Sequence, residues 1–292
     1  MSLITLKEML GVARQHRFAV GAFNAIDSHF IDGIFTAAEQ NESPIILNVA
    51  EVHTRRIDLV DIATYVKHKA NQAAIPVALN LDHGLTFETV EKALKAGFTS
   101  IMYDGSHLEY EENVKNTRTV VEMCKEYGAS VEGELGAVGG DEGGALNGEA
   151  DESLYTPVDL VQDYIGRTGI DALAVAIGNA HGKYKGIPKL DFARLEALNH
   201  LSSVPLVLHG GSGLSERDFK RAIEFGIAKI NFYTGMSQAS IASIRDNIDN
   251  PEFITQYDHY LLMMKEVQAE IADTVTGQMN IFSSVNKKAL YE

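Results

Sequence analysis

Short apolar runs alternate with longer amphipathic stretches along most of the chain. The stretches place apolar residues three and four positions apart, as in IDGIFTAAEQ and SERDFKRAIEFG, and this spacing indicates helices. Eight apolar runs predict β-strands: FAVGAF (18–23), PIILNV (44–49), PVALNL (76–81), SIMYD (100–104), SVEGEL (130–135), ALAVAIG (172–178), PLVLHG (205–210) and IAKINFY (227–233). Eight strand-and-helix units predict an α/β fold of the (β/α)8 TIM barrel type. A doubly wound open sheet is the alternative, but no GxGxxG motif follows the first strand, which favours the barrel.

The sequence continues with helical segments beyond the last of these strands. ASIASIRDNI and YDHYLLMMKEVQAEIADTV are more than a barrel needs, so we expect extra C-terminal helices. Such helices commonly form contacts between copies of a chain, and a homodimer or homotetramer is therefore expected. With 292 residues and 45% hydrophobic content, the chain is predicted to form a single domain over residues 1–292.

Residues 136–155, GAVGGDEGGALNGEADESLY, interrupt the alternation. They contain six glycines and five acidic residues, a composition that predicts a loop. Because the loop follows a strand on the side where barrels hold their active sites, we interpret it as a lid, with a plain surface loop as the alternative. Local signals also predict that helices begin at Thr86, Thr156, Asp191 and Ser215.

Charge and composition narrow the classes of partner. The chain has 25 basic and 40 acidic residues, a net charge of −15, and no stripe of Lys and Arg, which argues against binding nucleic acid. No stretch approaches roughly 20 consecutive apolar residues, which argues against a membrane partner. Cys124 is the one cysteine and the first residues do not resemble a signal peptide, so we expect a cytoplasmic protein.

Three histidines stand beside glycine directly after apolar runs: His83, His181 and His209. In a barrel each would lie at the carboxyl end of a strand, where such folds gather their chemistry. Three neutral imidazoles from three strands can hold one catalytic Zn²⁺ with a position left open for water or substrate. A structural zinc site would favour cysteines, and a single histidine of this kind is more often a hydrogen-bonded core residue.

Carboxylates lie at the ends of the third, fourth and fifth predicted strands. Asp82 precedes His83, Asp104 ends the fourth predicted strand, and Glu134 lies at the end of the fifth. At a strand end Asp82 can act as an acid or base beside a metal-bound histidine. Asp104 and Glu134 can orient a ligating histidine or bind a metal themselves.

The glycine-rich HGGSG sequence predicts a site for an anion. Gly210, Gly211 and Ser212 precede a helix that begins near Ser215, so backbone N–H groups would point at a bound anion. The loops after strands seven and eight are where barrels most often bind phosphate, and Asn231 and Thr234 follow the eighth strand. Lys185, four residues beyond His181, can add positive charge, so a small phosphorylated ligand is expected.

Six ordered motifs carry a resemblance to a known family. NLDHG, MYDGSH, EGELGAVGG, AIGNAHGKYKG, VLHGGSG and GIAKIN, over residues 80–231, resemble those of the class II, zinc-dependent ketose-bisphosphate aldolases, which include the fructose and tagatose 1,6-bisphosphate enzymes. The amino-terminal GAFNAIDSHFIDGIFTAAEQNESPIIL is similar as well, so the resemblance covers most of the chain. It implies a lyase of carbohydrate metabolism that cleaves a phosphorylated ketose to dihydroxyacetone phosphate and an aldehyde.

The resemblance also implies roles for individual residues. Zn²⁺ would bind His83, His181 and His209, with Asp104 and Glu134 as the alternative or second metal position. Asp82 would exchange the proton of the hydroxyl that becomes the aldehyde oxygen. Of the acidic pair in the loop, Glu142 is a better match than Asp141 for the base at carbon. The phosphate of dihydroxyacetone phosphate would be bound by Gly182, Lys185, Gly210, Gly211, Ser212, Asn231 and Thr234, and a Na⁺ or K⁺ ion is a further candidate at the carbonyls there.

The end of the eighth strand departs from the family's pattern. Tyr233 stands where a carboxylate would contact the sugar hydroxyls, so it is a substrate-binding candidate of different chemistry, and Ser237 stands where a cation would meet a distal phosphate. Asn80, where the family commonly has histidine, is a milder departure. Fructose 1,6-bisphosphate is therefore disfavoured as the substrate, unless a basic residue such as Arg55 or Arg56 replaces the missing cation.

Two other functions remain open on the sequence alone. A metal-dependent sugar-phosphate isomerase or epimerase could use the same barrel without an acid that protonates a departing aldehyde oxygen. A catalytically silent sugar-phosphate-binding protein would explain the altered eighth strand, but the intact Asp82, His83, His181, His209 and Glu142 argue against it.

Overall fold

The computed structural model describes residues 3–139, 152–182 and 188–292 and contains a closed barrel of eight parallel strands in sequence order. The strands are β1 (Val20–Asn24), β2 (Ile45–Ala50), β3 (Val77–Gly84), β4 (Ser100–Tyr103), β5 (Ser130–Leu135), β6 (Ala172–Val175), β7 (Leu206–Leu208) and β8 (Ile227–Phe232). The barrel closes where β8 pairs with β1, with Lys229 opposite Val20. The predicted (β/α)8 architecture is confirmed.

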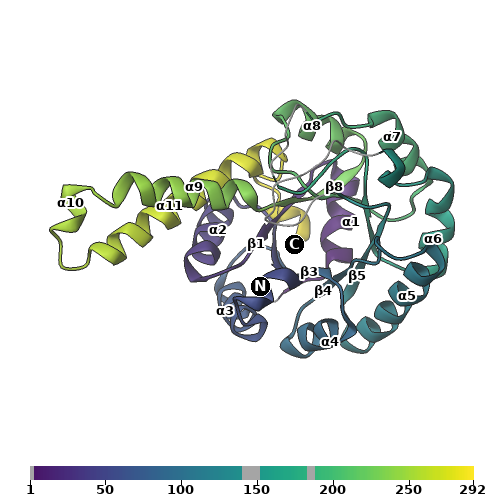
Figure 1. Ribbon diagram of the computed structural model, residues 1–292, viewed down its shortest axis with the longest axis horizontal. Helices are drawn as coiled ribbons and strands as arrows, with labels where there is room; N and C mark the ends of the chain where they lie inside the picture. The colour runs from purple at the N-terminus through teal and green to yellow at the C-terminus, as the bar shows by residue number, and fades with distance from the viewer. Residues whose placement is uncertain (1–2, 140–151, 183–187) are drawn as a thin grey trace.

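Helices surround the barrel (Figure 1). They are α1 (Leu6–His16), α2 (Ser28–Gln40), α3 (Leu59–Gln72), α4 (Phe87–Ala96), α5 (Tyr110–Tyr127), α6 (Val161–Thr168), α7 (Phe192–Leu201), α8 (Glu216–Glu224), α9 (Thr234–Asn247), α10 (Pro251–Ile254) and α11 (His259–Ile281). Short 3₁₀ turns are η1 (Glu51–Arg55), η2 (Glu152–Leu154), η3 (Val158–Leu160) and η4 (Lys288–Tyr291).

Three of the four predicted helix caps are confirmed. The side chains of Thr86, Asp191 and Ser215 accept hydrogen bonds from backbone N–H groups in the first turns of α4, α7 and α8. Thr156 was predicted wrongly. Its hydroxyl donates to the Leu135 carbonyl and accepts from the N–H of Ala176, so it joins the ends of two strands rather than capping a helix.

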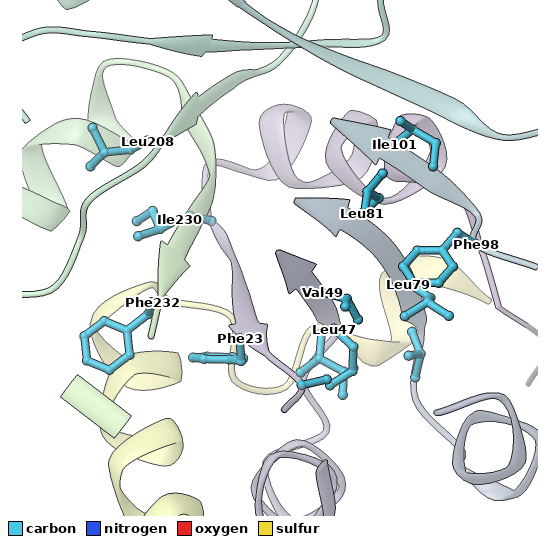
Figure 2. Close-up of a cluster of buried hydrophobic side chains, with 14 of the residues drawn as sticks. Phe23, Leu47, Val49, Leu79, Leu81, Phe98, Ile101, Leu208, Ile230 and Phe232 are labelled. Carbon is cyan, nitrogen blue, oxygen red and sulfur yellow. The ribbon is translucent and has the colours of Figure 1, made fainter. Parts of the chain in front are cut away.

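Aliphatic and aromatic side chains fill the layer between the barrel and the helices. Phe23, Leu47, Leu79, Ile101 and Ile230 point outward from five strands into this layer and are fully buried (Figure 2). Because side chains alternate along a strand, the residues between them point into the barrel.

Helix α1 closes the amino-terminal end of the barrel. Leu6, Met9 and Leu10 are fully buried and pack, with Ala13, against the small and aliphatic residues of the barrel interior. The N–H of Leu6 lies 2.9 Å from Oγ of Ser100 and 3.0 Å from Oγ of Ser130, so both strand starts bind the first turn of the helix. Because α1 fills this end, a site open to substrate can form only at the carboxyl ends of the strands.

Helices α9, α10 and α11 form an arm that projects away from the barrel (Figure 1), which confirms the extra C-terminal helices. The half of α11 near the barrel buries Val267, Ile271, Val275 and Met279. Among the described residues, no helix is both long and apolar enough to cross a membrane. That residues 1–292 form a single domain stays a prediction.

Candidate active site

The structure brings the three predicted histidines together at the carboxyl ends of the strands. The ring centroid of His83 lies 4.8 Å from that of His181 and 4.6 Å from that of His209, and the other two are 5.9 Å apart. One nitrogen of each ring lies within 4.8 Å of the others, and all three residues are buried. This arrangement matches what one tetrahedral metal ion requires of three protein ligands.

Asp82 and His83 face the same site although they are adjacent in β3. The backbone of His83 has φ 45°, in the left-handed region, and the pairing of β3 with β4 shifts register between Leu81 and Gly84. This irregularity lets two neighbouring side chains reach one cavity, which a regular strand would not allow. Left-handed backbone is unfavourable for a residue other than glycine, and such strain concentrates at functional sites.

Carboxylates orient two of the histidines. Nδ1 of His83 lies 2.8 Å from Oδ2 of Asp104, and Nε2 of His209 lies 2.8 Å from Oε1 of Glu132. With these outer nitrogens held as donors, Nε2 of His83 and Nδ1 of His209 face each other at 2.9 Å. A carboxylate behind each ring is the arrangement that sets the tautomer of metal-binding histidines.

Burial keeps two of the imidazoles, those of His181 and His209, neutral. The pKa values of His181 and His209 lie well below the ordinary value because burial disfavours the charged ring, and the nearby His83 adds to the effect. Neutral imidazole is the form that binds a metal. The donor set and its charge state therefore fit a borderline divalent ion such as Zn²⁺.

Asp104 and Glu134 form a second candidate group with His83. Burial raises the pKa of Asp104, but hydrogen bonds from His83 and Ser106 outweigh it and hold that pKa well below the ordinary range. Glu134 has a pKa well above its usual value because of burial and the charge of Asp104. Its Oε1 accepts from the N–H of Val138, while Oε2 is buried without a hydrogen-bond partner among the described residues. An orphaned carboxylate oxygen at this place fits a cation ligand.

Asp82 is fully buried beside the histidines. Its Oδ1 lies 2.9 Å from Nδ2 of Asn231, and its Oδ2 has no hydrogen-bond partner in the described parts of the chain. Burial raises the pKa of Asp82. The neighbouring His83, Lys229 and His209 together lower it by more than burial raises it, so the pKa lies below the ordinary value. The site thus holds a charged carboxylate with one oxygen available to accept a proton.

A small polar pocket adjoins the histidines. It is lined by all the described residues predicted to bind substrate: Gly182, Gly210, Gly211, Ser212, Asn231, Tyr233 and Thr234. A Cβ at Gly210, where φ is 66°, would overlap the Ala180 carbonyl, and a Cβ at Gly211 would lie 2.8 Å from the Asn231 carbonyl oxygen. Both positions therefore require glycine. Glu142, its neighbour Asp141, and Lys185 lie outside the described residues.

A second, larger cavity of about 1120 Å³ opens beside the first, and both are lined by Tyr233 and Thr234. Its wall includes Arg55, Arg56 and Ser237. The arginines named in the sequence analysis as a replacement for the missing cation are thus on the correct side of the barrel.

Sequence reasoning missed a buried ion pair behind the histidines. Nζ of Lys229 lies 2.6 Å from Oε2 of Glu132, the carboxylate that orients His209. Alternation could have indicated both residues. Glu132 shares a strand face with Glu134, and Lys229 shares one with Asn231.

The fold and the site together define a barrel enzyme with a candidate metal centre and an adjoining polar pocket. A model of the family described as fructose-bisphosphate aldolase class-II matches residues 4–287. A fructose-bisphosphate aldolase of Staphylococcus aureus (strain Mu50) is 40% identical over 291 residues, which cover 98% of this chain and 99% of the relative. The chain belongs to the class-II fructose-bisphosphate aldolase family, whose members are lyases of carbohydrate metabolism.

Solved structures agree with this assignment. The YdjI aldolase from Escherichia coli K12 has a TM-score of 0.86 and 31% identity, with 98% of this chain and 99% of that chain covered. A fructose-bisphosphate aldolase from Campylobacter jejuni is 22% identical, with a TM-score of 0.84 over 98% of this chain and 97% of that chain, and shows the likeness of fold.

Proposed function

We propose that this protein is a Zn²⁺-dependent aldolase that reversibly cleaves a ketose 1-phosphate or 1,6-bisphosphate to dihydroxyacetone phosphate and an aldehyde. The observation that carries the proposal is the cluster of His83, His181 and His209 beside the charged carboxylate of Asp82. One oxygen of that carboxylate, Oδ2, has no hydrogen-bond partner among the described residues. Membership of the aldolase family supports it.

The three histidines would hold the zinc ion, with Asp104 and Glu134 as the second or alternative position. A bound Zn²⁺ would act as a Lewis acid that stabilises the negative charge developing on the dihydroxyacetone phosphate half. No lysine in a Schiff base is then required. A Na⁺ or K⁺ ion at the carbonyls near Gly182 and Gly210 is a further part of the proposal.

The proton transfers fall to two carboxylates. Asp82 accepts the proton of the hydroxyl on the carbon that becomes the aldehyde, while the adjacent carbon–carbon bond breaks and its electron pair stays with the dihydroxyacetone phosphate half. Glu142 then donates a proton to the carbon that received the pair. The released products are the aldehyde and dihydroxyacetone phosphate, and in the reverse direction the two carboxylates exchange their acid and base roles.

The polar pocket would bind the phosphate of dihydroxyacetone phosphate. Gly182, Gly210 and Gly211 let the backbone approach closely, and Ser212, Asn231 and Thr234 add polar groups. We place Lys185 there as the cationic contact. The projecting arm formed by α9 to α11 is the proposed contact surface of a homodimer or homotetramer.

Exchange of the carbon-bound proton of dihydroxyacetone phosphate with solvent tests the proposal. NMR in deuterated water should show enzyme-dependent exchange that stops after chelation and returns with Zn²⁺ or Co²⁺, because three neutral imidazoles suit borderline metals better than Mg²⁺. Full activity in excess chelator, with no metal found by elemental analysis, would overturn the zinc dependence. An absence of both exchange and cleavage in the zinc-loaded protein would overturn the aldolase assignment.

A further inference from the structure

The turn between β3 and α4 is bound by a side chain from the neighbouring strand. Glu51 directly follows β2, and its carboxylate reaches across to this turn. Oε2 of Glu51 accepts hydrogen bonds from the N–H of Leu85 at 2.6 Å and from the N–H of Thr86 at 3.3 Å. Oε1 accepts a third from the hydroxyl of Thr86 at 3.0 Å. We call these three hydrogen bonds the Glu51 contacts.

The Glu51 contacts also reach the first turn of α4. The Thr86 hydroxyl that donates to Glu51 accepts a hydrogen bond from the N–H of Thr89 at 3.2 Å and is the N-cap of the helix. A carboxylate beside the N-terminus of a helix is favourable because the helix dipole is positive there. One side chain therefore joins the end of β2 to the start of α4.

Apolar burial does little to hold this turn. All eight residues of β3 are buried, but Leu85 is 42% exposed and Thr86 is exposed as well. Segments with few buried contacts open at a low cost in free energy. The Glu51 contacts supply the anchoring that packing supplies elsewhere in the barrel.

The metal ligand His83 stands two residues before Leu85. Its backbone is in the left-handed region, a conformation that persists only where its surroundings enforce it. On one side, the N–H of Asp104 donates to the carbonyl of Gly84 at 3.0 Å. On the other side, Glu51 holds the next two N–H groups of the chain. The turn that carries His83 is thus fixed from both neighbouring strands.

Fixing the backbone of His83 is a separate task from orienting its ring. Oδ2 of Asp104 lies 2.8 Å from Nδ1 and sets the direction of the imidazole. The distance of that imidazole from His181 and His209 depends on where the backbone of His83 lies. Three ligands of one ion must meet their bond lengths within about 0.2 Å, so a small shift of this turn weakens binding.

We propose that Glu51 is a positioning residue of the metal centre. Its three hydrogen bonds fix the turn after β3 and hold His83 where its ring shares one ion with His181 and His209. Glu51 acts through the backbone and not as a ligand. This inference rests on the proposed function, in which His83 binds zinc, and it assigns part of the affinity for zinc to a residue outside the ligand set.

Titration of the metal-free protein with Zn²⁺, in competition with a chromophoric chelator, tests the proposal. Glu51→Ala removes all three acceptor contacts and should raise the dissociation constant of Zn²⁺ at least ~10-fold, the scale of losing a group that orients a metal ligand. Glu51→Asp keeps the charge but is one methylene shorter, so it should show a similar loss. Glu51→Gln keeps the length and one acceptor oxygen and should lose less.

The visible absorption of bound Co²⁺ gives a second measurement, because it reports the geometry of the ligands. The spectrum should change in Glu51→Ala and Glu51→Asp. Val90→Ala truncates a fully buried side chain of α4 and lowers stability away from the Glu51 contacts. Glu88→Gln removes an exposed carboxylate from the first turn of the same helix. Both controls should leave the zinc affinity and the Co²⁺ spectrum unchanged.

Three results overturn the proposal. The first is an unchanged zinc affinity in Glu51→Ala and Glu51→Asp. The second is an equal loss in Val90→Ala, which would attribute the effect to lower stability. The third is a loss in Glu51→Ala but not in Glu51→Asp, which would attribute it to charge. If circular dichroism shows that Glu51→Ala is unfolded, equal affinities of Glu51→Asp and Glu51→Gln overturn the proposal.

The unmutated protein separates this inference from the proposed function. Zinc binding by the unmutated protein without any effect of the Glu51 variants refutes the positioning role alone. No binding of Zn²⁺ by the unmutated protein refutes the zinc centre and the positioning role together.

Discussion

Lys229 and Glu132 form an ion pair inside the barrel, with Nζ 2.6 Å from Oε2 and both side chains fully buried. The other oxygen of Glu132 holds Nε2 of His209 at 2.8 Å. One carboxylate therefore balances a buried lysine and orients a candidate metal ligand. Stability and metal binding depend on the same side chain, and substitutions can separate the two effects.

Replacing Glu132 by leucine should leave the charge of Lys229 buried and unpaired. Breaking a buried pair in this way typically costs about 3–5 kcal/mol of unfolding free energy. The Glu132→Leu/Lys229→Met double variant should regain most of that stability, yet its affinity for Zn²⁺ should stay about 10–100-fold below the unmutated value because His209 has lost its carboxylate. Urea unfolding and metal titration measure the two quantities. Recovery of both in the double variant would contradict the orienting role of Glu132.

Asp82→Asn should slow carbon–carbon bond cleavage much more than it slows proton transfer at carbon. The asparagine keeps an oxygen for Asn231 but cannot accept the hydroxyl proton, so the cleavage rate should fall by ~100-fold or more. Exchange of the carbon-bound proton of dihydroxyacetone phosphate, which needs only Glu142, should fall much less. Coupled assays of cleavage and NMR exchange give both rates. An isomerase or epimerase would show no such division.

Glu142→Ala should slow the exchange of that carbon-bound proton by at least ~100-fold, the scale of losing a general base, while the zinc content stays normal. Asp141→Ala serves as the matched control because the two acids are adjacent in the sequence. If the Asp141 variant shows the large loss and the Glu142 variant does not, the role belongs to Asp141.

Cys124 should resist alkylation in the folded protein. Its side chain is 1% exposed, and burial, with a smaller effect of Asp171, raises the pKa of the thiol to about 12. At pH 8 the reaction with iodoacetamide, followed by mass spectrometry, should be at least ~100-fold slower than in urea. The neutral thiol is the form that the fold favours, so its contribution to stability is complete below pH 9, the ordinary thiol value, and is lost as the pH rises toward 12. Rapid alkylation of native protein would contradict the burial.

Local patterns predicted the barrel because each strand and each amphipathic helix has its own periodicity. The three histidines were predicted because a residue at the carboxyl end of a barrel strand reaches a common site wherever it lies in the sequence. Strand ends were less accurate. SIMYD was expected to extend to Asp104 and ALAVAIG to Gly178, but the strands end at Tyr103 and Val175.

Features that depend on distant partners could not be predicted. Thr156 has the local character of a helix cap, yet its hydroxyl bridges Leu135 and Ala176. The pairing of Glu132 with Lys229 joins β5 to β8 across the barrel interior, and the local sequence of neither strand indicates which residue is the partner. The sequence could name Arg55 and Arg56 as basic residues after the second strand, but only the fold places them on a wall shared with Tyr233.

Helix α1 stops the barrel at its amino-terminal end, and this gives the interior one entrance. A cleavage reaction makes two molecules from one, and both must then leave by the route through which the substrate came. In our proposal, the phosphate half lies in the small polar pocket beside the histidines, and a larger cavity adjoins that pocket at Tyr233 and Thr234. Release of both products through one entrance favours a fixed order of product release, in which the aldehyde departs first and dihydroxyacetone phosphate follows.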